Sequence, residues 1–199
     1  MDIEHEYDVI AAFFCRGVAW LTAESAHMNA RLSSGVHTDD FVEEMLFHPN
    51  GPGSLENILC RVILNELNAL IEAALQQVLI DKSKSYFIND KTLVIGASRF
   101  QLQGALAGQG IDVTTFKDYR HLCEIKELAE GFKHRQGLRP LPKWEKNQNN
   151  LAFQSSLVAG FKEETIEGYD ISVDHVRKYL VSVKAFLTQI QRHIGNNVF

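Results

Sequence analysis

The stretch SVDHVRKYLVSVKAFLTQIQRHIG, from Ser172 to Gly195, decides the fold. Its apolar residues alternate steps of three and four over three heptads, which is the pattern of an amphipathic helix with one buried seam. Ser172 suits the N-cap and Gly195 suits the C-terminal end, so we expect one helix between them. The seam consists of Val173, Val176, Leu180, Val183, Leu187, Ile190 and Ile194.

Two more long helices are predicted in the N-terminal half of the chain. Residues 2–32 carry apolar side chains at helical spacing. After the breaker HPNGPG at 48–53, Ser54 is a good N-cap for a second helix with a wide apolar face. That face comprises Leu55, Leu59, Val62, Ile63, Leu67, Leu70, Ile71, Ala74, Val78 and Leu79.

The sequence in the middle of the chain is compatible with either a strand or a helix at one place. Within residues 92–108, the apolar run 93–95 is either a short strand or the first turn of a helix. A further helix begins at Asp112 or Thr114 and runs to about Arg135, because glycine and two prolines follow it.

Several two-faced helices separated by polar breakers predict an all-α fold. We expect an up-and-down bundle of four to five long helices in a single domain over residues 1–199. A short helix over residues 39–47 and a β-hairpin or irregular flap near 151–170 complete the prediction.

Composition bounds the class of protein. With 199 residues, 45% apolar and 23% charged, the chain can bury a core and is not disordered. The net charge of −5 argues against a protein that coats nucleic acid generally. Three unpaired cysteines, an acidic N-terminus and the lack of a long uninterrupted apolar run favour a cytoplasmic protein without a membrane segment.

Known cofactor and metal patterns are incomplete. Gly96 lacks the later glycines of a dinucleotide-binding loop. The pairs Glu24/His27 and Asp118/His121 have the spacing of a di-iron bundle, but the last helix offers no ligand at the right depth. We therefore predict no metal and no cofactor, and read Asp40, Glu44 and His48 as a solvated face.

One segment stands out by charge. Between Gly131 and Lys146 the only acid is Glu145. The cations are Lys133, Arg135, Arg139, Lys143 and Lys146, with Trp144 and His134 among them. Such cations could hold phosphates while Trp144 stacks on a base. The simpler interpretation is that they offset a helix dipole and solvate a loop.

The order of elements carries a resemblance to a known family. The second helix contains LNELNALIEAA at 64–74, and the later helix ends in FKHRQG at 132–137, a KH-x-x-G ending. With the long first helix, a variable insert and a final amphipathic helix, this plan resembles the HEPN superfamily of helical domains. The resemblance spans residues 2–194 in plan and is most specific over 127–137.

The resemblance implies one of several RNA-related roles. Members include RNA-cutting toxins and defence nucleases, non-catalytic partners of nucleotidyltransferases, and RNA binders. The nuclease pattern is an Arg followed by a His on one helix, which would make His134 the catalytic imidazole. The positions for the Arg hold Glu127, Leu128 and Ala129 instead. The literal match Arg31 with His37 straddles a predicted helix end and is interpreted as chance.

Three functions follow as expectations. The first is a non-catalytic HEPN-like domain that binds RNA or a partner protein through the cations and Trp144 of residues 131–146. The second is a metal-independent endoribonuclease in which His134 moves the proton and Glu127 orients it. The third is a dimeric interaction module using the heptad helix. The expected partners are RNA, a second copy, and a nucleotidyltransferase or antitoxin.

Overall fold

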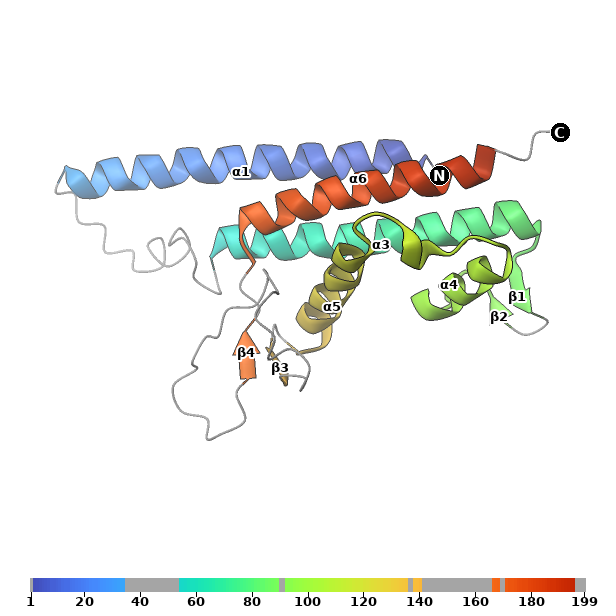
Figure 1. Ribbon diagram of the computed structural model, residues 1–199. Coiled ribbons are helices and arrows are strands. Elements are labelled where there is room, and N and C mark those ends of the chain that lie inside the picture. Colours follow the sequence, from blue (N-terminus) through green and yellow to red (C-terminus); the bar gives the residue numbers. More distant parts are fainter. Residues whose placement is uncertain are drawn as a thin grey trace.

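The computed structural model describes residues 2–34, 54–89, 92–135, 138–140, 166–168 and 171–195, and its helices dominate (Figure 1). The long helices are α1 (Ile3–Ser33), α3 (Leu55–Ser83), α5 (Tyr119–Arg135) and α6 (Val173–Gly195). Shorter elements are α4 (Arg99–Gly108), the 3-10 turn η1 (Val113–Thr115), and the strands β1 (Phe87–Asn89), β2 (Thr92–Leu93), β3 (Leu138–Pro140) and β4 (Ile166–Gly168).

Helices α1, α3 and α6 lie side by side in the bundle. In Figure 1, α1 runs opposite to α3, and α6 runs with α3. Helix α5 lies across α3 at a steep angle in Figure 1, and the two helices are in contact, since Arg61 of α3 lies over the Phe132 ring. The protein is therefore an all-α helical bundle, as the sequence predicts.

Helix α3 is the centre of the bundle. It contacts α1, α4, α5 and α6, and most of its predicted apolar face is buried. Ser54 caps it as expected, accepting a hydrogen bond from the Asn57 backbone N–H at 3.1 Å. Lys84, at φ 52°, adopts the left-handed conformation that stops the helix.

Helix α6 buries the predicted heptad seam. Val176, Leu180, Val183, Leu187 and Ile190 all lie in the core, and Phe186 widens the seam with 1% of its surface exposed. Ser172 and His175 form a reciprocal cap, since each backbone N–H donates to the other residue's side chain. The prediction from the last stretch of sequence is confirmed.

The start of α5 was predicted too early. Asp112 caps only the 3-10 turn η1, where its carboxylate accepts from the Thr114 backbone N–H at 3.0 Å. Asp118 then has φ 61°, a left-handed conformation that a right-handed helix cannot pass through. The helix therefore begins at Tyr119 rather than at Asp112 or Thr114.

The alternative left open for residues 92–108 resolves into both elements. Thr92–Leu93 is a strand that pairs antiparallel with Phe87–Asn89. A separate helix then starts at Arg99, because Ser98 and Gln101 form a complete capping box.

A second pair of strands includes part of the predicted insert near 151–170. Strand β4 lies within that range, but its partner is β3 at Leu138–Pro140, so the two strands bracket the intervening chain. Residues 151–165, and the short helix predicted over 39–47, lie outside the described residues.

Helix α1 qualifies the expectation of no membrane segment. Its stretch Ile3–Ala30 is long and apolar enough to cross a membrane by length and composition alone, because an 18-residue window within it has a mean hydropathy of 1.3. Arg16 and Glu24 interrupt the apolar residues, which is why uninterrupted runs looked short in the sequence. Only 6% of that window is buried, and Tyr7 and Phe14 are among the residues by which the helix contributes to the core.

We predict that Phe186→Ala lowers the free energy of unfolding by about 3–5 kcal/mol, because it leaves a cavity beside α3. The matched control is Phe100→Ala, since Phe100 is 81% exposed and should change stability by less than about 0.5 kcal/mol. Urea denaturation followed by circular dichroism measures both. Equal losses for the two variants would contradict the described core.

Candidate anion-binding groove

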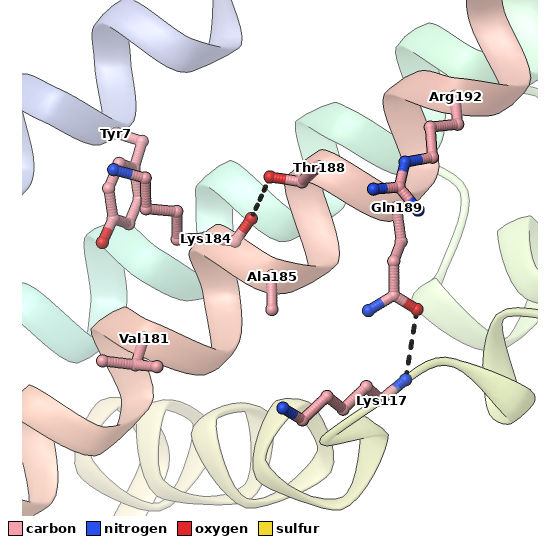
Figure 2. Close-up of a pocket in the computed structure, with 8 residues that line it drawn as sticks. All are labelled: Tyr7, Lys117, Val181, Lys184, Ala185, Thr188, Gln189 and Arg192. Atoms are coloured by element: carbon pink, nitrogen blue, oxygen red, sulfur yellow. Dashed lines mark hydrogen bonds between the residues drawn. The ribbon is translucent and has the colours of Figure 1, made fainter.

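A groove of about 580 Å³ runs along the solvent face of α6 (Figure 2). Tyr7 of α1 borders it on one side, and Lys117, in the loop before α5, borders it on the other. Positions three and four residues apart on α6 form its floor, since they share one helix face. These α6 residues are Val181, Lys184, Ala185, Thr188, Gln189 and Arg192.

The groove is cationic. Of the described residues that line it, Lys117, Lys184 and Arg192 are exposed cations and none is acidic. Within the described part of the chain, no carboxylate makes an ion pair with these three side chains. Their charge is therefore available to an anionic ligand.

One end of the groove is held by the contact between α1 and α6. The Tyr7 hydroxyl donates to the Leu180 carbonyl at 3.1 Å, and burial raises the pKa of this phenol. The Lys184 ammonium lies 5.8 Å from the centre of the Tyr7 ring, a cation–π distance. Tyr7 thus orients Lys184 without neutralising its charge.

The opposite side is held by the loop before α5. The Lys117 backbone N–H donates to Gln189 Oε1 at 3.2 Å, as the dashed line in Figure 2 marks. Next to it, the Phe116 ring stacks on His193 with centroids 5.8 Å apart. Both contacts attach the loop to α6, so the position of Lys117 is set by tertiary structure.

The spacing of the cations favours an extended ligand. Lys184 and Arg192 are eight residues apart on one helix, which separates their backbones by about 12 Å. A chain of phosphates can therefore contact both cations while each side chain binds its own phosphate.

Polar groups between α5 and α6 make structural contacts. His121 Nδ1 lies 2.7 Å from Ser182 Oγ, yet Ser182 is only 2% exposed and donates to the Lys178 carbonyl. Substrate therefore cannot reach this Ser–His pair. Beside it, buried Glu124 accepts from Arg120 Nε at 3.2 Å and from the Tyr179 hydroxyl at 3.4 Å.

A buried arginine joins three helices. Arg99 Nη1 donates to the Leu122 carbonyl at 3.0 Å and to Asn68 Oδ1 at 3.3 Å. Burial lowers the pKa of this guanidinium, and the nearby Cys123 opposes that effect. We assign Arg99 to the fixing of α4 against α3 and α5.

Most of the site residues predicted from sequence fall where side chains are not described. Glu127 lies on α5, and the backbone of Lys133, His134 and Arg135 forms the last turn of that helix. Arg139 lies on β3, which contacts α5. Lys143 and Trp144 lie outside the described residues.

The metal-ligand spacings find little support in the described residues. Asp118 precedes the start of α5, so it does not share a helix face with His121. The part of the chain that the structure describes holds no group of three side chains suited to a metal ion. Asp40, Glu44, His48 and His37 lie outside it.

The groove was not predicted from the sequence. The four-residue spacing of Lys184, Thr188 and Arg192 was visible as the polar face of the last helix, opposite its seam. Nothing in the sequence placed Lys117 beside that face, because 72 residues separate Lys117 from Gln189.

Comparison with known proteins gives no match to a family model, a curated protein or a solved structure.

The α5–α6 cluster predicts an alkaline loss of stability. Burial and the Glu124 charge raise the pKa of Tyr179 above its ordinary value of 10.0. Above pH 10 the unfolded chain loses this proton while the folded chain keeps it, so stability falls as pH rises, by up to about 1.4 kcal/mol per pH unit. Below pH 10 this contribution is fully present.

We expect Tyr179→Phe to make the decline above pH 10 shallower, measured by urea denaturation at several pH values. Tyr86→Phe is the control, because Tyr86 is 63% exposed and should leave the profile unchanged. An unaltered slope in Tyr179→Phe would contradict the assignment.

Proposed function

We propose that this protein is a non-catalytic, HEPN-like helical domain that binds an RNA strand. The observation that carries the proposal is the groove on α6, whose cations Lys117, Lys184 and Arg192 face no acidic lining residue within the described chain. Backbone phosphates are the recurring anions of RNA, and Lys and Arg are the side chains that neutralise them.

A strand fits the groove better than a mononucleotide does. The cations along α6 extend over about 12 Å, which spans more than one phosphate. The overall charge of −5 means that attraction must be local, so binding is expected to depend on these few contacts and to weaken with salt.

The basic segment 131–146, which begins at the end of α5 that lies away from Lys117, would provide further contacts to RNA. Its cations Lys133, Arg135, Arg139 and Lys143 would hold further phosphates, and Trp144 would stack on a base. A second copy of the chain, a nucleotidyltransferase or an antitoxin would then be the protein partner that the family resemblance implies. We place the protein in the cytoplasm.

Binding without cleavage is favoured by the chemistry of the groove. Among the described residues that line it there is no histidine and no carboxylate, so the groove offers neither an imidazole nor a carboxyl group for proton transfer. Cleavage would have to come from His134 with Glu127, which is the alternative function.

We predict that Lys184→Glu or Arg192→Glu weakens binding of a fluorescent oligouridylate by about tenfold or more at low salt, because each replaces a phosphate contact by repulsion. The salt dependence should also become weaker: the magnitude of the slope of log affinity against log salt concentration should decrease by about one. Lys126→Glu is the matched control, since this lysine lies on α5 outside the groove and undergoes the same charge change. Equal effects from all three variants would contradict groove binding.

The cleavage alternative has its own test. We expect the purified protein to leave total RNA intact both with and without a chelator. Cleavage that persists in chelator and disappears in His134→Ala would show an endoribonuclease instead and would overturn the non-catalytic assignment.

A further inference from the structure

Helix α1 has an exposed strip along one of its faces. Val9, Phe13 and Trp20 are 50%, 56% and 51% exposed, and Arg16 lies among them. Their steps of four, three and four residues place all four side chains on one face of the helix. Arg16 follows Tyr7 by nine residues, which is half a turn around the helix, so the strip faces away from the groove.

Helix α3 continues this surface. Gly17 of α1 meets Leu59 of α3 so closely that a Cβ on Gly17 would lie 2.8 Å from Leu59 Cδ2. From this point the helices run in opposite directions, so Phe13 and Val62 lie at nearly the same height. Ile58 and Val62 are each 44% exposed, which extends the apolar surface from α1 onto α3.

The strip can pair with the same strip of a second copy that runs in the opposite direction. Its 4–3–4 spacing is symmetric about the peptide between Phe14 and Cys15. A second α1 laid antiparallel about that point brings Arg16 opposite Phe13 of the other copy, and Val9 opposite Trp20, twice each. Arginine over an aromatic ring is a favourable pair, and a two-fold axis satisfies both copies by the same contact.

We propose that this face of α1 and α3, defined by Val9, Phe13, Arg16, Ile58 and Val62, is the interface of a two-fold symmetric homodimer. The large residues supply the apolar contact, and Arg16 sets the register by meeting the aromatic ring of the second copy. Because the anion groove lies on the other flank of α1, the dimer presents two open grooves. The proposal holds whether or not the groove binds RNA.

A membrane surface fits this face less well than a second copy does. Arg16 lies in the middle of the apolar strip, where a lipid chain offers it no partner. The carboxylates of Asp2, Glu4, Glu6 and Asp8 precede the strip and would be repelled by anionic headgroups.

The test is the mass of the protein in solution without RNA. Sedimentation equilibrium should give twice the chain mass of 22.5 kDa, and Phe13→Glu should give one chain mass with unchanged helical circular dichroism. Phe100→Glu is the matched control, because Phe100 is 81% exposed on α4 and should leave the dimer intact.

Variants of Arg16 test whether this residue sets the register of the dimer or whether the association is only hydrophobic. Arg16→Glu should weaken the dimer at least tenfold, whereas Arg16→Lys keeps the cation and should weaken it less. A monomeric wild type, an unaffected Phe13→Glu dimer, or equal effects at Phe13 and Phe100 would overturn the proposal. So would wild-type binding to phosphatidylcholine vesicles that Phe13→Glu abolishes, since it would assign the face to lipid. Groove variants such as Lys184→Glu should remain dimeric, so failure of RNA binding does not affect this result.

Discussion

Burial of the apolar surface of α3 is the constraint on which the rest of the structure depends. This helix contacts α1, α4, α5 and α6, and residues such as Leu64, Leu67 and Ile71 are fully buried between them. A helix with so wide an apolar face cannot remain in water, so its neighbours are arranged around it. Each neighbour then keeps one face for the core and leaves another face to solvent.

The groove follows from that arrangement. The seam of α6 is used for the core, which leaves Lys184, Thr188 and Arg192 on the opposite side. Alone, this face would be an ordinary solvated surface. It becomes concave because Tyr7 and Lys117, carried by α1 and by the loop before α5, flank it. The concavity gathers cations in a chain whose overall charge is −5.

Helical periodicity predicted the long helices, and local chemistry predicted their caps at Ser54 and Ser172. Local chemistry did not predict the start of α5, because Asp112 and Thr114 both suit an N-cap and the interruption is a single left-handed residue, Asp118. Nor could it predict the groove, since the hydrogen bond from Lys117 to Gln189 is a tertiary contact. Periodicity determines which face is buried, whereas the convergence of two distant polar faces depends on packing.

Helix α1 borders the groove on one flank and carries the proposed dimer interface on the other, and this arrangement affects how strongly such a domain would bind RNA. Three cations at one groove give only a few phosphate contacts, and each is weakened by salt. Two grooves carried by one dimer would act on the same strand, so the second contact would form at a high effective concentration. A modest site on an acidic protein can thus bind a long strand firmly while releasing a short one. A two-fold interface away from the groove would serve RNA binding better than one that covers it, because self-association through the groove face would remove the cations from the ligand.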